Sequence, residues 1–245
     1  MASLHLQNTT VANEMLDQIK PIVGTTSTRF RRLLALCLES EGEYDQALAI
    51  YNDLKRQNPS NVYALKRIYS LHNAQVGKEE EARELLNDYL ERNGSDAGAW
   101  MELSDSCAAL GDWAGAAHAL EEVVLVSPLD SNIHCKLAEY YVTMGDYVKG
   151  RKHFCQSLEL NSKNLRAVYG LMSAAEGYLD SVENMTGAGQ GDNNNKKKNA
   201  KNKASVVDEE DVELAKDLLQ YGNDKLVKAY KGTAMSGLVT SAILS

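Results

Sequence analysis

A turn motif recurs along this 245-residue chain at an interval of 34 residues, and that interval most limits the folds open to it. Gly111 and Gly145 are 34 residues apart, and the aromatic residues that follow them, Trp113 and Tyr147, keep the same interval. A period of this length is typical of repeat architectures, in which each unit buries its apolar face against the next one. The chain is therefore predicted to form a stack of repeats rather than a single globular core.

Each copy of the motif indicates two helices of about 13 residues joined by a tight turn. The turn carries glycine because this residue enters the left-handed backbone region without a steric penalty. A small residue in the second helix allows a close approach of the two helices, and the bulky residue four positions later lies on the same face. These small and bulky pairs are Ala47 and Tyr51, Ala82 and Leu86, Ala116 and Leu120, and Gly150 and Phe154.

The same frame predicts where helices stop and which aromatic side chains are buried. Pro59 and Pro128 come just after predicted second helices and end them. Trp100 and Trp113 fall in the two helices of one copy, and we expect both side chains to be buried between repeats.

These residues resemble the tetratricopeptide repeat (TPR) family, which implies an all-α, right-handed superhelical solenoid of antiparallel helix pairs. Four full repeats are expected at 28–61, 62–96, 97–130 and 131–164, followed by the first helix of a fifth at 165–179. Residues 1–27 are expected to form a partial N-terminal repeat, because Val11–Ile22 has the pattern of a second helix.

The C-terminal part departs from the repeat. Residues 184–206 are rich in Asn, Gly and Lys, and such a segment is predicted to be a disordered loop. Residues 207–245 are predicted to form helices that complete and cap the solenoid. We expect one helix at Asp208–Tyr221 and a last one from about Asn223 to Leu244.

Composition excludes several classes of protein. A net charge of −8 and a pI near 5.2 argue against a nucleic-acid-binding protein, which needs a basic face. The short run Lys196–Lys203 could attract RNA or anionic lipid, but a solvated loop is favoured because the run is diluted by asparagine. We expect no membrane span, since no run of about 20 apolar residues is present. With no signal-peptide pattern and four scattered cysteines, the sequence indicates a cytosolic protein with free thiols.

No enzyme signature is found. Phosphate-binding loops, nucleophile elbows and HExxH motifs are all missing, so we expect no catalytic residue, cofactor, metal or small-molecule substrate. His118, His134 and His153 are interpreted as structural or exposed side chains.

Binding therefore remains the predicted activity, and the resemblance to TPR proteins implies a concave groove lined by the first helices. Such a groove binds an extended segment or a helix of a partner protein. The exposed stripe of the first helices is predicted to carry Arg29, Arg32, Tyr63, Lys66, Ser70, Asn73, Met101, Asp105, Asn132, Glu139, Arg166 and Tyr169.

One use of this groove is disfavoured. TPR co-chaperones grip a C-terminal carboxylate with Lys, Asn and Arg at fixed points of the first helices. Here Leu36 stands where the first Asn belongs, and Gly98 and Glu102 occupy the later Lys and Arg positions. An acid facing a carboxylate would repel it.

Beyond the general repeat pattern, the amino-acid sequence of the repeats resembles one particular family. Six stretches resemble subunit 2 of the endoplasmic reticulum (ER) membrane protein complex, and they are Arg29–Leu34, Glu43–Tyr51, Glu81–Leu90, Ala99–Ser104, Arg151–Asn161 and Asn164–Leu171. The resemblance implies a scaffold at the cytosolic face of the ER membrane, attached through other subunits of the complex. The assembled complex inserts tail-anchored and multi-pass membrane proteins. Members of that family usually carry further helices upstream, so contacts of those helices are not transferred to this chain.

Two alternatives stay open at this point. A different TPR adaptor would have the same fold and other protein partners. An enzyme or RNA-processing factor that uses the repeats as a platform is less favoured, because neither catalytic motifs nor a basic face support it.

Overall fold

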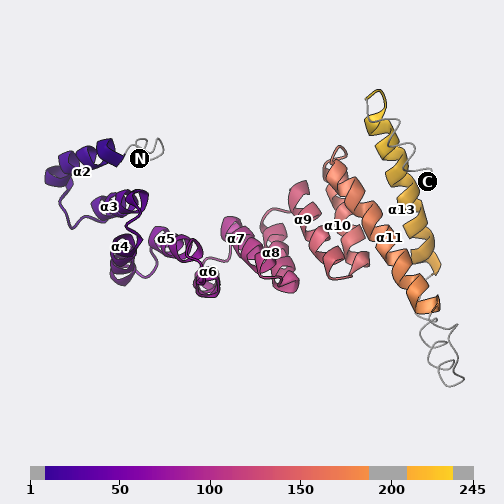
Figure 1. Ribbon diagram of the computed structural model, residues 1–245, viewed down its shortest axis with the longest axis horizontal. Helices are drawn as coiled ribbons and strands as arrows, with labels where there is room; N and C mark the ends of the chain where they lie inside the picture. The colour runs from indigo at the N-terminus through magenta and orange to yellow at the C-terminus, as the bar shows by residue number, and fades with distance from the viewer. Residues whose placement is uncertain (1–8, 188–208, 234–245) are drawn as a thin grey trace, which may run out of the picture. The chain divides into compact units, whose positions relative to one another are not determined.

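The computed structural model describes residues 9–187 and 209–233, and within these ranges every regular element is an α-helix (Figure 1). In chain order the helices are α2 (Thr9–Val23), α3 (Thr28–Glu41), α4 (Tyr44–Gln57), α5 (Val62–Asn73), α6 (Glu79–Arg92), α7 (Ala97–Ala109), α8 (Trp113–Val126), α9 (Ser131–Thr143), α10 (Tyr147–Leu160), α11 (Leu165–Gly187) and α13 (Glu209–Tyr230). The chain divides into two compact units, Met1–Ala99 and Trp100–Ser245, and each is described by itself.

The helices pack in sequence order within each unit. In the first unit, α2 packs on α3, α3 on α4, α4 on α5, and α5 on α6. In the second unit, α8 packs on α9, α9 on α10, and α11 on both α9 and α10. Each of the four expected repeat ranges holds one helix pair, and the all-α TPR fold is confirmed.

The turn between paired helices explains the Gly-Asp-aromatic motif. Gly145 has a φ of +82°, and this left-handed turn lets the Asp146 N–H donate to the carbonyl oxygen of Tyr141 at 2.9 Å. Asp146 then caps the next helix, because its Oδ1 accepts from the N–H of Lys149 at 3.1 Å. Gly111 and Asp112 repeat the same arrangement one period earlier. The glycine thus ends one helix and the aspartate begins the next.

The core of each pair forms where the small and bulky residues were predicted. Ala47, Ala82 and Ala116 are fully buried, and the bulky residues four positions later are at most 2% exposed. Gly150 takes the small position in the last pair, where a β-carbon would lie 2.6 Å from the Val142 side chain. Close helix contact at this position therefore requires a very small residue.

The C-terminal region differs from the expectation in two ways. Helix α11 has 23 residues and continues to Gly187, well past the expected end at residue 179. The expected separation into two helices near Gly222 is wrong, since α13 is a single helix from Glu209 to Tyr230. Gly222 faces α11, and a β-carbon there would lie 2.4 Å from the Met172 side chain, so this glycine serves helix packing rather than termination.

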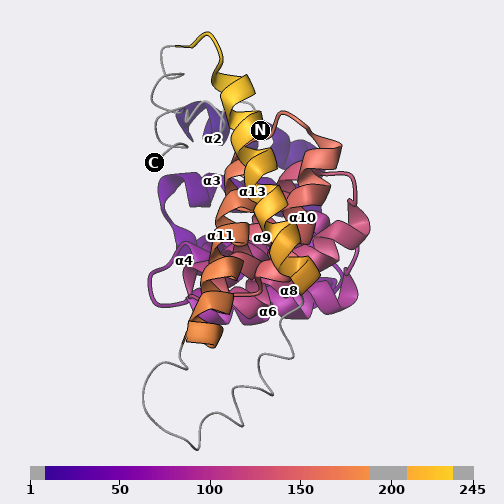
Figure 2. The same cartoon turned by 90° about the vertical axis from the view of Figure 1, so that its right-hand side faces the viewer.

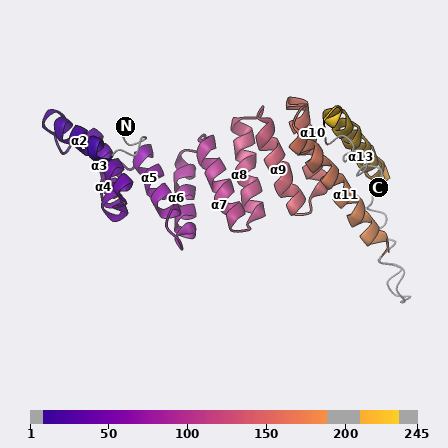
Figure 3. The same cartoon turned by 45° about the horizontal axis from the view of Figure 1, so that its top comes forward.

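Helix α13 lies along α11, as Figures 2 and 3 show from two further directions. Its Leu226 side chain joins a core cluster with Phe154, Val168 and Leu171. The expected disordered loop at 184–206 overlaps the end of α11 at residues 184–187, and the rest of it lies outside the described residues, as do residues 234–245.

The burial expected for the two tryptophans is also wrong, because both are only half-buried. Trp113 is the first residue of α8, and its side chain is partly exposed to solvent. The ring contacts Tyr140 of α9, with ring centroids 5.7 Å apart. Trp113 therefore lies between repeats but at the edge of the interface.

Candidate partner-binding surfaces

In the first unit, the predicted stripe residues hold neighbouring first helices together. The guanidinium of Arg32 on α3 lies 3.7 Å from the centroid of the Tyr63 ring on α5. Lys66 on α5 pairs with Asp96 at 2.5 Å, and the Tyr89 hydroxyl donates to the same carboxylate at 2.7 Å. Desolvation raises the pKa of Asp96, but the hydrogen bonds from Lys66 and Tyr89 outweigh it and lower the pKa overall.

In the second unit, a ladder of opposite charges crosses three first helices. Asp105 on α7 pairs with Lys136 on α9. Glu139, one turn further along α9, receives two hydrogen bonds from Arg166 on α11, at 2.5 and 2.6 Å. These bonds raise the pKa of Arg166. The two hydrogen bonds between Arg166 and Glu139 fix the orientation of both side chains, so this pair connects α9 and α11 in one geometry.

Eleven of the twelve predicted groove residues fall into two groups, and Ser70 belongs to neither. Those in the first group contact a neighbouring helix or loop, and they are Arg32, Tyr63, Lys66, Asp105, Glu139, Arg166 and Tyr169, the last through a hydrogen bond with Tyr230. Ser70 instead bonds the carbonyl oxygen of Lys66 one turn back. The remaining members are solvent-exposed, and they are Arg29, Asn73, Met101 and Asn132. Whether either group binds a partner remains a prediction.

A histidine pair lies inside the fourth repeat. The Nδ1 atoms of His134 on α9 and His153 on α10 are 3.2 Å apart, and the two rings are stacked. His153 also stacks on Tyr141, whose hydroxyl donates to Glu121 of α8. Burial, with a further contribution from His134, lowers the pKa of His153. The lowered pKa favours the neutral form of His153, which agrees with a structural role.

A buried ion pair fastens α13 to the repeats. Arg151 on α10 is 4% exposed, and its Nη2 donates to Asp211 Oδ1 at 3.0 Å while Nη1 donates to the Asp211 carbonyl at 3.2 Å. The guanidinium also lies 4.5 Å from the ring centroid of Tyr178 on α11. One side chain therefore connects α10, α11 and α13. Sequence reasoning missed this contact, because its partners are 60 residues apart.

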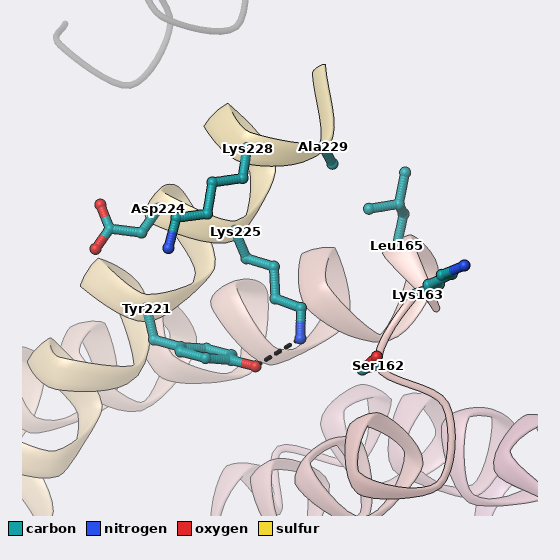
Figure 4. Close-up of a pocket in the computed structure, with 8 residues that line it drawn as sticks. All are labelled: Ser162, Lys163, Leu165, Tyr221, Asp224, Lys225, Lys228 and Ala229. Atoms are coloured by element: carbon teal, nitrogen blue, oxygen red, sulfur yellow. Dashed lines mark hydrogen bonds between the residues drawn. The ribbon is translucent and has the colours of Figure 1, made fainter. Parts of the chain in front are cut away.

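A cleft of about 560 Å³ opens between the α10–α11 loop and the C-terminal half of α13 (Figure 4). Three lysines line it, Lys163 from the loop and Lys225 and Lys228 from the helix. Lys225 extends from α13 toward the loop and donates to the Tyr221 hydroxyl at 2.7 Å. Leu165 adds an apolar wall. The sequence analysis missed this site, although the spacing of Lys225 and Lys228 places both on one helix face.

Potential metal ligands, thiols and long apolar helices were considered in the part of the chain that the structure describes. No group of three or more His, Cys, Asp or Glu side chains there is placed to hold a metal ion. Cys37, Cys107 and Cys135 are buried thiols, and burial raises the pKa of Cys135 to about 11. Within the same ranges, no helix has the length and apolar character needed to cross a membrane.

Comparison with known proteins identifies the repeat array. A family model described as the EMC2 TPR-like repeat domain matches residues 14–160, which is more than half of the chain. The chain belongs to the EMC2 family. The match begins within α2 and ends at the last residue of α10, so α11, α13 and the lysine-lined cleft lie beyond it.

Curated relatives of this EMC2-family chain are named as subunit 2 of the ER membrane protein complex. ER membrane protein complex subunit 2-A of Xenopus laevis is 38% identical over 159 residues, covering 64% of this chain and 51% of the relative. ER membrane protein complex subunit 2 of Dictyostelium discoideum is 28% identical over 197 residues, covering 73% and 61%. The chain thus spans about half the length of the Xenopus relative, and activities of the whole relatives are not transferred directly.

Solved structures agree on the fold. A TPR protein named YrrB, described as having an unusual peptide-binding site, gives a TM-score of 0.57 at 13% identity, covering 94% of this chain and 97% of that one. The Pseudomonas aeruginosa protein PilF gives 0.54 at 14% identity, with coverages of 98% and 93%. At such low identity these likenesses support the TPR fold alone.

Proposed function

We propose that this chain is a non-catalytic TPR scaffold subunit of the ER membrane protein complex. In this role it binds the cytosolic parts of membrane-anchored subunits and holds them together, so that the complex can insert tail-anchored and multi-pass proteins. The observation that carries the proposal is the family match, which covers the complete run of repeat helices from α3 to α10. The proposed location is the cytosolic face of the ER membrane, reached through the partner subunits.

The architecture supports a scaffold for a physical reason. The buried core holds the first helices in place, and cross-helix contacts such as Asp105 with Lys136 and Glu139 with Arg166 order side chains on their surface before any partner arrives. A surface that is already ordered loses little conformational freedom on binding, so more of the contact energy appears as affinity. The side chains that remain exposed along the first helices can then contact partner segments.

The test is co-purification of a tagged chain from cells with a mild detergent. We expect integral membrane subunits of the complex to be recovered in stoichiometric amounts. Recovery of soluble partners alone would contradict the proposal and would favour a different TPR adaptor. Crosslinking mass spectrometry on the recovered assembly would then show which helices contact which subunit.

A matched pair of variants makes the experiment more specific. Asn132→Arg and Met101→Arg each place a bulky cation on an exposed stripe position, whereas Lys152→Glu changes an exposed residue of a second helix. If the stripe contacts partners, the first two variants should lower recovery of membrane subunits and the third should not. Equal recovery with all three would place the interface elsewhere.

A further inference from the structure

The lysine-lined cleft carries charge of the opposite sign to the rest of the chain. Three lysines and a single acid, Asp224, contribute to its lining, which gives the cleft a net charge of about +2 on a chain of net charge −8. The first turn of α11 also borders it, and the positive end of that helix dipole adds to the lysines. We propose that this cleft binds an acidic peptide segment of a partner protein.

The composition of the walls favours a peptide over an anionic lipid headgroup. Leu165 and Ala229 give the cleft apolar surface between its lysines, and the Tyr221 ring adds more. A peptide can place carboxylates on the lysines and an apolar side chain on these walls, whereas a headgroup is polar throughout and leaves the apolar walls uncovered. Asp224 can accept a hydrogen bond from a peptide N–H.

The volume of the cleft also favours a peptide. A volume of about 560 Å³ lies within the range of ligand-binding clefts, roughly 300–1,000 Å³. It accommodates several residues of an extended chain and is larger than an inorganic phosphate requires.

The helix dipole of α13 explains one of the three lysines without a ligand. Lys228 lies in the last turn of α13, where a cation stabilises the negative end of the helix dipole. That effect explains neither Lys163, which comes from a different segment, nor Lys225, whose ammonium donates to the Tyr221 hydroxyl at the cleft wall. Lysines from two segments of the chain line one hollow, and this placement of positive charge is the observation that carries the proposal.

This inference deepens the proposed scaffold role by naming one binding surface and the chemistry of its partner. The test uses the purified full-length chain and no other subunit, so its failure would leave the co-purification result untouched. The probe is a fluorescein-labelled peptide of about ten residues that combines glutamates with leucines, as an acidic recognition segment would. The same peptide with glutamine in place of glutamate serves as the uncharged probe.

Two double variants that remove equal charge are compared by fluorescence anisotropy. Lys225→Gln with Lys228→Gln changes the cleft, whereas Lys152→Gln with Lys216→Gln changes exposed lysines outside it. We expect the cleft variant to bind the acidic peptide about tenfold more weakly or worse, because charge-assisted contacts are lost. The outside variant should change the affinity less than about twofold, since its lysines act only through screened long-range charge.

Several outcomes would overturn the inference. Equal weakening by both double variants would mean that binding follows overall charge, and equal binding of the uncharged probe would remove the role of the lysines. Binding to phosphatidylserine vesicles that is lost in the cleft variant, with no peptide binding, would reassign the cleft to a membrane surface. If the cleft variant melts below the wild type, Lys163→Gln in the loop replaces it, with an expected loss of about threefold or more.

Discussion

The ion pair between Arg151 and Asp211 gives the sharpest test of how α13 is held. The two partners are not equivalent, because Arg151 is 4% exposed whereas the Asp211 side chain is 35% exposed. Water can rehydrate an unpaired Asp211, but it cannot reach an unpaired Arg151. We therefore predict that removing the acid costs more stability than removing the base.

The magnitudes follow from the contacts. Asp211→Ala leaves a buried guanidinium without its carboxylate, and breaking a buried pair in this way costs about 3–4 kcal/mol. Arg151→Met keeps most of the apolar packing and loses the charged hydrogen bonds and the contact with the Tyr178 ring, which together amount to about 1.5–2.5 kcal/mol.

Urea unfolding followed by circular dichroism measures both changes, and hydrogen exchange of α13 shows whether the loss is local. Asp217→Ala, an exposed acid of the same helix, is the matched control, with an expected change below about 0.5 kcal/mol. The reasoning is refuted if Asp211→Ala is as mild as this control, or if Arg151→Met is the more damaging change. Either result would mean that the guanidinium is hydrated in the native state.

Three further predictions concern packing and pH. Gly170→Ala places a β-carbon 2.2 Å from the Phe154 ring and should lower the free energy of unfolding, measured in urea, by about 1–2 kcal/mol. Ser173→Ala, on the exposed face of the same helix, is the control and should not lower it. Trp113→Ala should cost about 1.5–3 kcal/mol, less than a fully buried tryptophan, because its ring is half-buried, and the same assay measures it. Because the pKa of His153 is lowered in the folded state, the unfolded chain binds more protons below about pH 6.5. The melting temperature should therefore fall as the pH decreases through that value. In the His153→Phe variant this fall should be smaller.

Local rules were sufficient to predict the repeat core from the sequence. Period, turn glycines and the small and bulky pairs each depend on residues within one helix pair, and Tyr51, Leu86 and Phe154 are buried as predicted. The Gly-Asp motif is equally local, because the glycine ends one helix and Asp146 caps the next.

The C-terminal helices could not be predicted by the same rules. Two separate helices were predicted on either side of Gly222, although a single helix runs through it. The role of this glycine depends on Met172, fifty residues earlier, and no local pattern indicates which helix α13 will meet. The candidate surfaces show the same limit. Stripe positions follow from helical period, but the pairing of Glu139 with Arg166 depends on the distance between two helices.

These long-range contacts link the stability of α13 to the proposed peptide site. Asp211 fastens the beginning of the helix, Gly222 lets its middle approach α11, and Leu226 anchors the later half in the core formed by α9, α10 and α11. Lys225 and Lys228 flank Leu226, so they face the α10–α11 loop only while this anchor is in place. Loosening the helix with Asp211→Ala should therefore weaken acidic-peptide binding even though no residue of the cleft is altered. Unchanged affinity in that variant would show that the C-terminal half of α13 stays docked without its N-terminal ion pair.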